Sequence, residues 1–361
     1  MRLIRPPTPT YPDLRFWADR RVLVTGHTGF KGGWLALWLS QMKARVTGIS
    51  LPPITEPNLF SLAHVDEVTN SHLCDIRDAD GVSALVGEAD PEIVFHLAAQ
   101  PLVRTSYRDP LGTIATNVQG TANLLEALRP LKTLRVVVVI TTDKVYKSLE
   151  HPFPCREDDT LGGHDPYSTS KAAAELIVDC YRASYLQKQG IAVATARAGN
   201  VIGGGDWSED RLIPDAVRAW ARGASLVVRR PEAVRPWQHV LEPLSGYLRL
   251  AERLWHEPGL AGAYNFGPHT HEASTVREVI TLARAAYGAG EVSWGDGAEG
   301  PHETDRLTLE SSKARLLLGV EPRWDLDTSV TRTMQWYRRQ ADGEPARLLC
   351  EADISAFSTA G

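Results

Sequence analysis

A tyrosine and a lysine stand four residues apart in the segment Tyr167-Ser168-Thr169-Ser170-Lys171. If this segment is helical, the spacing puts Tyr167 and Lys171 on one face. An ammonium beside a phenol lowers the pKa of the phenol, and the phenolate can then take a proton from a hydroxyl group while hydride leaves the same carbon. The pair therefore predicts proton and hydride chemistry on an alcohol, although the spacing alone also fits a pair on the surface.

A second polar group follows a β-branched run. Residues 135–141 predict a central strand, and the chain continues as Thr142-Asp143-Lys144. In open α/β sheets, ligands bind just beyond the carboxyl ends of the strands. We therefore assign Thr142, Asp143 and Lys144 to catalysis, together with Tyr167 and Lys171, and place Thr141 at a cofactor. Ordinary solvation of a loop is the alternative.

Three glycines, Gly26, Gly29 and Gly32, lie between the buried run 21–25 and an apolar helix that continues from Gly33. The first permits a tight turn, the second lets backbone amides approach a pyrophosphate, and the third lets the helix pack against the strand. A purely structural turn is the alternative to this dinucleotide site. The residues assigned to the turn site are Gly26, Thr28, Gly29, Phe30, Lys31 and Gly32.

The ends of the next two strands complete the expected dinucleotide site. The second strand, 45–50, ends without the acidic residue that usually holds the adenosine ribose, so Ser50 is our candidate for a ribose hydroxyl. Arg45 precedes that strand and so gives no argument for NADP. Asp75-Ile76 ends the third strand, where it flanks an adenine, or where Asp75 merely caps a turn.

The elements that must position these residues alternate regularly. Strands are predicted at 21–25, 45–50, 71–76, 92–98, 135–141 and 191–197, and helices at 33–39, 79–88, 111–128 and 166–189. Continuous apolar strands between amphipathic helices predict an α/β fold with a doubly wound, mostly parallel Rossmann-type sheet.

The composition changes from about Gly203, where Gly, Pro, Trp and Arg become frequent and the elements shorten. Two clear helices remain, 274–287 and 326–339. We predict a Rossmann domain at 16–202 and a smaller mixed C-terminal substrate lobe at 203–340. The boundary is soft because strands of such folds can cross between lobes. Residues 1–15 and 341–361 are expected to be terminal extensions.

The bulk composition excludes several classes of protein. A net charge of -5 and a pI near 6.1 give no general attraction to nucleic acid or anionic lipid. The four cysteines lack C-x-x-C spacing, so neither a metal site nor a disulfide framework is expected. Neither a secretory signal nor a membrane span is recognisable, so a cytoplasmic location is expected.

Longer strings resemble a known family. With the glycine turn and the Tyr167/Lys171 pair, the segments 97–101 and Thr142-Asp143 and the residue Asn117 resemble the extended short-chain dehydrogenase/reductase superfamily. Within it, the strings 27–32, 99–104, 197–207 and 235–240 are similar to those of CDP-glucose 4,6-dehydratases. The resemblance runs from about Phe16 to about Arg339.

The resemblance implies a reaction without net redox change, in deoxysugar biosynthesis. Tyr167 would take the proton of the C4 hydroxyl of CDP-glucose while NAD takes the C4 hydride. Water would then leave across C5 and C6, and the hydride would return to C6 to give CDP-4-keto-6-deoxyglucose. Related dTDP-sugar enzymes have Asp-Glu as acid and base where this chain has Asp143-Lys144. We therefore expect Asp143 to be the acid and Lys144 the base.

The resemblance also extends the two binding sites. To the NAD site it adds Leu97, Ala98, Ala99, Gln100 and Asn117. The phosphates of a nucleotide sugar need local cations in a net-acidic chain. The substrate-binding candidates are Arg104, Asn200, Arg211, Arg235 and His302. His302 lies in a polar turn that either lines the nucleotide site or is a simple capped loop.

Two other functions remain open at this point. A nucleotide-sugar 4-epimerase shares the glycine turn, the threonine, the tyrosine and the lysine, but it needs no acid/base pair like Asp143-Lys144. A non-catalytic NAD-binding regulator typically lacks the tyrosine or the lysine. The segments 111–128 and 166–189 are apolar on more than one face, which in this superfamily predicts a homodimer, with a tetramer as a further possibility.

Overall fold

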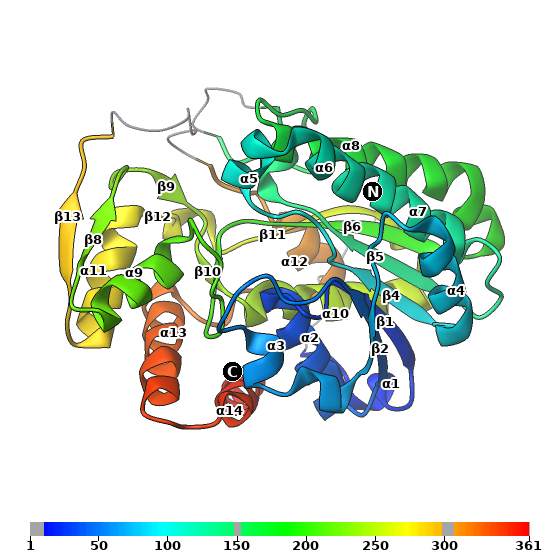
Figure 1. Ribbon diagram of the computed structural model, residues 1–361. Coiled ribbons are helices and arrows are strands. Elements are labelled where there is room, and N and C mark those ends of the chain that lie inside the picture. The colour runs from blue at the N-terminus through cyan, green and yellow to red at the C-terminus, as the bar shows by residue number, and fades with distance from the viewer. Residues whose placement is uncertain (1–10, 148–152, 298–306, 361) are drawn as a thin grey trace.

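The computed structural model describes residues 11–147, 153–297 and 307–360. Figure 1 shows one large sheet with helices on both faces, and a smaller group of helices and short strands beside it. The sheet has seven strands in the order β11-β6-β5-β4-β1-β2-β3, and all of its neighbouring strands are parallel. The strands are β1 (Arg21–Thr25), β2 (Arg45–Ser50), β3 (Asn70–Leu73), β4 (Ile93–His96), β5 (Val136–Ile140), β6 (Ala192–Ala198) and β11 (Gly262–Phe266).

The strand order reverses between β1 and β4. The chain runs outward from β1 through β2 to β3, returns to β4 on the other side of β1, and continues through β5 and β6 to β11. This confirms the predicted doubly wound sheet, and β11 adds a strand that the sequence pattern did not predict. Because the chain leaves the paired strands β1 and β4 toward opposite edges of the sheet, the topological switch point lies at their carboxyl ends, where such sheets bind ligands.

Successive residues of the strands contribute their side chains to two different hydrophobic cores, one on each face of the sheet. In β1, Val22 and Val24 belong to one cluster and Leu23 to the other, as the two-residue period of a strand requires. One face is covered by α4 (Ala79–Ala89), α7 (Gly120–Leu128) and α8 (Pro166–Tyr181). The other face is covered by α2 (Phe30–Gln41), α10 (Leu241–His256) and α12 (Ser312–Leu318).

Two predicted helices contain irregular turns. The segment predicted at 111–128 forms α6 (Pro110–Ile114), a π-helical turn at Ala115–Gln119, and α7. The helix predicted at 166–189 begins as α8 and continues through a π-helical turn, Arg182–Leu186, to Gln189. It ends at Gly190, whose φ of 79° suits glycine. Short helices also lie in the first part of the chain. They are α1 (Leu14–Trp17), α3 (Leu59–Leu62) and α5 (Val103–Arg108).

The smaller group of elements is mixed, as predicted. β13 (Glu291–Trp294) pairs with β8 (Ser225–Val228) in parallel, and β12 (Ser274–Thr275) pairs with β9 (Val234–Arg235) antiparallel. The pair formed by β7 (Val201–Ile202) and β10 (Gln238–His239) is parallel. The helices of this group are α9 (Leu212–Ala221), α11 (Val276–Tyr287) and α13 (Leu326–Ala341).

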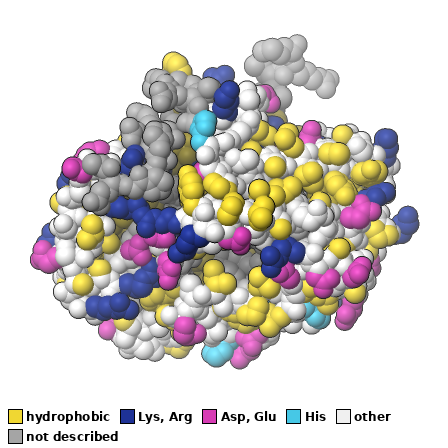
Figure 2. All heavy atoms as spheres, turned by 45° about the horizontal axis from the view of Figure 1, so that its top comes forward, with side chains coloured by type: hydrophobic (Ala, Val, Ile, Leu, Met, Phe, Trp, Pro, Cys, Tyr) yellow, Lys and Arg dark blue, Asp and Glu magenta, His cyan; other side chains and the backbone are white. Residues whose placement is uncertain are grey.

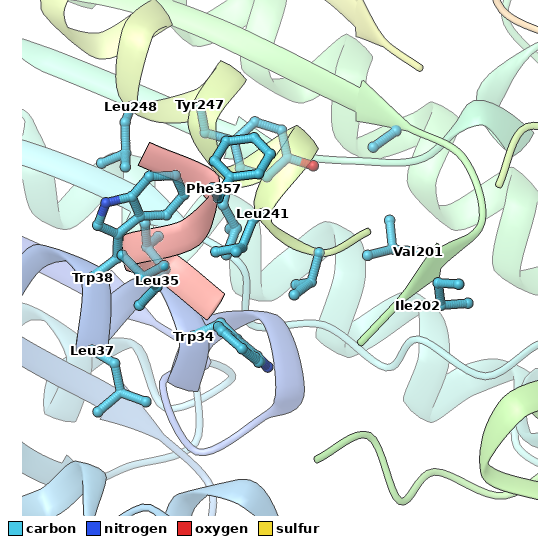
Figure 3. Close-up of a cluster of buried hydrophobic side chains, with 14 of the residues drawn as sticks. Trp34, Leu35, Leu37, Trp38, Val201, Ile202, Leu241, Tyr247, Leu248 and Phe357 are labelled. Atoms are coloured by element: carbon cyan, nitrogen blue, oxygen red, sulfur yellow. The ribbon is translucent and has the colours of Figure 1, made fainter. Parts of the chain in front are cut away.

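The main sheet also uses residues from beyond 203. Both α10 and β11 belong to its layers, although they follow the predicted domain boundary. The last helix, α14 (Ala346–Thr359), lies in the segment expected to be an extension, yet it buries Phe357 beside Trp38 of α2. Figure 3 shows Phe357 among side chains of α2 and α10. None of the helices in the described ranges is both long and apolar enough to cross a membrane.

Candidate active site

A cleft with a volume of about 770 Å³ opens at the carboxyl ends of the central strands. It is bounded by the glycine turn, the segment after β5, the start of α8 and the loop 198–211. Figure 2 shows Lys and Arg side chains around a recess on this face. The predicted residues that line the cleft are Gly26, Thr28, Gly29, Phe30, Lys31, Gly32, Ser50, Asp75, Ile76, Leu97, Ala98, Ala99, Arg104, Thr141, Thr142, Asp143, Lys144, Tyr167, Lys171, Asn200, Arg211 and Arg235.

The glycine turn is closed by backbone contacts that leave no room for side chains. A Cβ at Gly32 would lie 2.1 Å from the Gly26 carbonyl oxygen, and one at Gly26, where φ is 81°, would lie 2.8 Å from the Ala98 nitrogen. Gly29 caps α2, and within the described residues no side chain accepts a hydrogen bond from this helix start. The first turn of α2 therefore offers amide groups and a positive dipole end to an anion in the cleft.

His27, the second residue of the turn, points away from the cleft. Its Nε2 lies 2.6 Å from the Ser71 hydroxyl on β3, and its ring lies against Gly48 of β2. Burial lowers the pKa of His27 to about 4. The imidazole is therefore neutral at physiological pH and contributes to packing between the first three strands.

The residues predicted at the adenosine end line the cleft and also bond to one another. The Thr28 hydroxyl lies 2.8 Å from the Ser50 hydroxyl and donates to the Leu51 carbonyl. Asp75 accepts from the Arg77 guanidinium at 2.6 Å and from the Arg77 backbone amide at 2.9 Å, and these bonds lower the pKa of its carboxyl. Asp75 is thus a turn residue as well as a lining residue.

Two residues predicted for cofactor binding lie behind the wall of the cleft. The Asn117 side chain accepts from the Gln100 amide at 2.8 Å and donates to the Gln100 carbonyl at 3.1 Å. It also donates to the Ser170 hydroxyl at 2.9 Å. Asn117 therefore ties the loop after β4 to α8, and a direct contact of Asn117 or Gln100 with a cofactor stays a prediction. His302 lies outside the described residues.

Tyr167 and Lys171 lie on the buried face of the first turns of α8, which Asp165 caps by accepting from the Ser168 amide. Lys171 Nζ donates to the Ile140 carbonyl at 2.8 Å. Burial raises the pKa of Tyr167 to about 12, while a hydrogen bond to Thr142 and the charge of Arg211 act in the lowering direction. Burial therefore dominates the pKa of Tyr167, and the lowering by Lys171 that the sequence led us to expect stays a prediction.

Lys171 is itself affected by burial. Desolvation lowers the pKa of its ammonium to about 8, and the carboxylate of Glu175, one turn further along α8, acts in the opposite direction. A lysine with this pKa changes charge within the range in which enzymes are usually assayed.

The segment after β5 forms a short 3-10 turn, Asp143–Val145, capped by Thr142. Asp143 Oδ1 accepts from the Thr142 hydroxyl at 3.0 Å and from Lys144 Nζ at 3.3 Å. The Asp143 side chain is 1% exposed and that of Lys144 is 35% exposed. Asp143 Oδ2 has no hydrogen-bond partner among the described residues. A buried carboxylate oxygen in this position is ready to bond a ligand in the cleft.

The predicted phosphate-binding residues reach the cleft from both sides. Arg104 of α5 pairs with Asp210 at 2.9 Å, and Arg211 pairs with Asp206 at 3.3 Å. Asn200 has a buried Oδ1 without a hydrogen-bond partner in the described part of the chain. Arg235 lies in β9 and is 8% exposed. These groups surround the same cleft as the catalytic candidates.

Lys31 adds a further cation from the glycine turn. Burial lowers the pKa of its ammonium to about 7, and Arg211, Lys171 and Lys144 act in the same direction, whereas Asp143 opposes them. This lysine therefore lies within electrostatic range of the whole catalytic group.

The sequence analysis missed the apolar part of the lining. Several large apolar side chains line the cleft although they are mostly exposed. They are Leu51, Ile54, Tyr107, Phe153 and Val227. Their signal in the sequence was an apolar residue inside a segment whose other residues predict a polar loop or an edge strand.

Comparison with known proteins places the chain among nucleotide-sugar enzymes. Residues 23–333 match the model of the family described as GDP-mannose 4,6 dehydratase. The chain is 44% identical over 355 residues to CDP-glucose 4,6-dehydratase of Salmonella typhimurium, covering 96% of this chain and 99% of that protein. It is 32% identical to dTDP-glucose 4,6-dehydratase of Streptomyces antibioticus, covering 88% of this chain and 92% of that protein.

Solved structures share the fold at lower identity. UDP-glucose 4-epimerase of Stenotrophomonas maltophila, solved with bound NAD, aligns with a TM-score of 0.78 at 22% identity, over 90% of this chain and 99% of that one. The NAD complex of dTDP-glucose 4,6-dehydratase from Bacillus anthracis aligns with a TM-score of 0.74 at 23% identity, over 89% and 97% of the two chains. These structures support the Rossmann-type fold described above.

Proposed function

The chain belongs to the GDP-mannose 4,6-dehydratase family, and on that premise we propose that it converts CDP-glucose to CDP-4-keto-6-deoxyglucose with NAD as a recycled cofactor. One observation carries the choice of a dehydratase. Asp143 and Lys144 form a hydrogen-bonded acid/base pair in the same cleft as Tyr167 and Lys171. The choice of CDP-glucose follows from the relative in Salmonella typhimurium, which matches over nearly the full length of both chains.

The glycine turn fits the pyrophosphate of NAD. The contacts that a Cβ would make at Gly26 and Gly32 show how closely the backbone folds in this turn. The first turn of α2, which follows, has backbone amide groups that can donate hydrogen bonds to a phosphate. Ser50, Asp75 and Ile76 line the same end of the cleft and suit the adenosine. When bound, NAD would supply a hydride acceptor for C4 of the sugar and, in its reduced form, a hydride donor for C6.

Tyr167 acts as the base in the oxidation step. Its phenolate accepts the proton of the sugar C4 hydroxyl and becomes a phenol, and Thr142 holds the phenolic oxygen by the hydrogen bond that already lowers its pKa. Because burial keeps the Tyr167 pKa high, the phenolate needs positive charge nearby. The charge of Arg211 acts in this direction, and we propose that Lys171, one turn further along the buried face of α8, adds to it.

Asp143 and Lys144 act in the elimination step. A carboxylate and an ammonium joined by a hydrogen bond become a carboxylic acid and an amine when one proton moves from Lys144 Nζ to Asp143 Oδ1. The amine of Lys144 then takes the C5 proton, which the 4-ketone has made acidic. The Asp143 carboxyl protonates the C6 hydroxyl, and water leaves as the C5–C6 double bond forms.

Arg211, Arg235, Arg104 and Asn200 are the groups that we propose for the nucleotide part of the substrate. Arg104 and Arg211 already pair with acidic residues beside the cleft, so a bound diphosphate would compete with Asp210 and Asp206 for them. The lobe at 203–340 contributes two of these four residues, Arg211 and Arg235, which supports its proposed role in substrate binding.

The outer helices suit a homodimer, and we propose one, with a tetramer as a possible further assembly. Leu111 and Ile114 of α6 and Leu176 of α8 are 79%, 45% and 61% exposed. Figure 2 shows hydrophobic side chains gathered on the face that these helices form. A second copy would remove this apolar area from water. Light scattering that found only monomer at working concentration would overturn the proposal.

The two competing functions predict different results. A 4-epimerase would return a hexose with an inverted C4 and no deoxy carbon, and a regulator would bind NAD without turnover. The test is a panel of CDP-, dTDP-, UDP- and GDP-glucose with product detection by the alkaline absorbance of a 4-keto sugar and by mass. Loss of one water from CDP-glucose is the expected result. Activity with another nucleotide alone would overturn the choice of CDP-glucose and leave the reaction class intact.

A further inference from the structure

A buried ion pair lies beside the catalytic residues without being used in the reaction. Glu175 of α8 and Arg197 of β6 form two parallel bonds, Arg197 Nε to Glu175 Oε1 at 2.9 Å and Nη2 to Oε2 at 2.9 Å. Their side chains are 4% and 3% exposed. Because a buried charge is costly unless it is fully paired, such an arrangement holds its partners in one geometry.

This pair reaches both ends of the 142–145 segment that carries Asp143 and Lys144. At one end, the Thr141 hydroxyl donates to Glu175 Oε1 at 2.5 Å. At the other end, Arg197 Nη1 donates to the Tyr146 hydroxyl at 2.9 Å. The two flanking residues of the acid/base segment are therefore held by the two members of one ion pair.

Tyr146 is held further by the neighbouring edge strand. Its hydroxyl donates to Asn265 Oδ1 of β11 at 2.6 Å, and the Asn265 side chain donates to the Cys155 carbonyl at 3.0 Å and to the Glu310 carbonyl at 3.2 Å. The Tyr146 hydroxyl thus has a donor and an acceptor in place, both buried. Its position is fixed by β6, β11 and two further chain segments.

We propose that Tyr146, through the Glu175–Arg197 pair, is a positioning residue for the elimination step. This inference rests on the proposed dehydratase function. Tyr146 follows Lys144 by two residues, on the side of the segment away from Thr142. A displacement of about 1 Å at a reacting group can cost roughly a hundredfold in rate. Loss of the Tyr146 anchor therefore slows proton removal at C5 and protonation at C6.

The proposal separates the two halves of the reaction. The oxidation step uses Tyr167, Lys171 and Thr142. When the Tyr146 hydroxyl is removed, Lys171 keeps its bond to the Ile140 carbonyl, and Thr141, directly before Thr142, keeps its bond to Glu175. Oxidation then proceeds while elimination is slow. Reduced cofactor and a 4-ketohexose accumulate on the enzyme, a state that general damage to the fold does not produce.

The test is Tyr146→Phe in the full-length holoenzyme with CDP-glucose. We expect kcat to fall roughly ten- to a hundredfold with KM changed by no more than about twofold. In a single turnover, the near-ultraviolet absorbance of the reduced nicotinamide should rise and persist, and solvent deuterium should enter C5 slowly. Tyr264→Phe is the matched control, because the only hydrogen bond of the Tyr264 hydroxyl within the described residues is the one that it donates to the Leu260 carbonyl at 2.7 Å, and Tyr264 lies next to Asn265 in β11. It should behave as the unchanged enzyme.

Arg197→Lys is the second variant. It keeps a positive charge opposite Glu175 but lacks the nitrogen that reaches Tyr146, so it should show the same persistent reduced cofactor. The inference is overturned if both variants slow oxidation and elimination equally, or if neither step changes. An unchanged enzyme that forms no 4-keto sugar from any nucleotide-glucose would instead overturn the proposed function, and this inference with it.

Discussion

The imidazole of His27 occupies the space that a side chain at Gly48 would need. A Cβ at Gly48 would lie 2.4 Å from the His27 ring. The second residue of the glycine turn and a glycine of the second strand thus fit together as a pair. The turn therefore presents its glycines to the cleft while the His27 side chain packs between strands.

Gly48→Ala should destabilise the protein through this contact. The added methyl group forces the His27 ring away from Ser71, and overpacking of this kind costs about 1–3 kcal/mol. We expect a lower melting temperature and weaker NAD binding, measured by calorimetry. Adding His27→Ala should recover part of the loss, so a double variant no more stable than Gly48→Ala alone would contradict the pairing.

Tyr167→Phe should stop the reaction before hydride leaves the sugar. Removing a general base costs roughly 10²- to 10⁴-fold in rate. Because the ring stays in place, we expect NAD and CDP-glucose to bind with little change while reduced nicotinamide fails to appear in a single turnover. Formation of reduced cofactor at the normal rate would remove Tyr167 from the role of base.

Lys144→Ala should leave oxidation intact and block proton removal at C5. Lys144 is partly exposed, so its replacement should change stability little. We expect reduced cofactor to form and incorporation of solvent deuterium at C5 to fall at least about a hundredfold. Lys132→Ala, an exposed lysine before β5 at the opposite end of the sheet, is the control. Deuterium uptake at the normal rate in Lys144→Ala would end the base assignment.

Glu242 should make stability depend on pH. It is buried in α10 and accepts from the Arg323 and Trp324 amides at 3.0 and 2.8 Å, and burial raises its pKa to about 7 from a usual 4.5. The stabilisation is fully present below pH 4.5 and is lost as the pH rises through 7, because the folded state binds a proton that the unfolded state has released.

Glu242→Gln should remove that dependence. The relevant quantity is the free energy of unfolding of the unchanged protein minus that of the variant. As the pH rises between the two pKa values, this difference should fall by at most roughly 1.4 kcal/mol per pH unit. Denaturant titrations at about pH 5 and pH 8 measure the difference. Parallel pH curves for the two proteins would show that Glu242 keeps the same proton affinity in both states.

The convergence of the candidate residues could be predicted from the sequence because it follows from topology. Parallel strands bring their carboxyl ends to one edge, so the turn after β1 and the Asp143-Lys144 segment after β5 had to meet. The strand β11 was missed because Gly262-Ala263-Tyr264-Asn265-Phe266 lacks a β-branched run. It lies at the edge of the sheet through its backbone pairing with β6.

Side-chain direction and burial were beyond the sequence. Asn117 could be placed on the correct helix, but only the packing of its π-helical turn shows that it faces Gln100 and Ser170. The pKa of Tyr167 likewise depends on how completely water is excluded. A sequence motif predicts which groups lie near a phenol, but it does not predict how completely water is excluded from that phenol.

The contact between Phe357 of α14 and Trp38 of α2 joins the two ends of the described chain. The helix that begins at the glycine turn precedes α14 in the chain and so leaves the ribosome before it, yet its Trp38 packs against Phe357 of α14. During translation, α2 must therefore wait for α14 to emerge from the ribosome before its core is closed. Until then, the exposed tryptophan surface is open to chaperones.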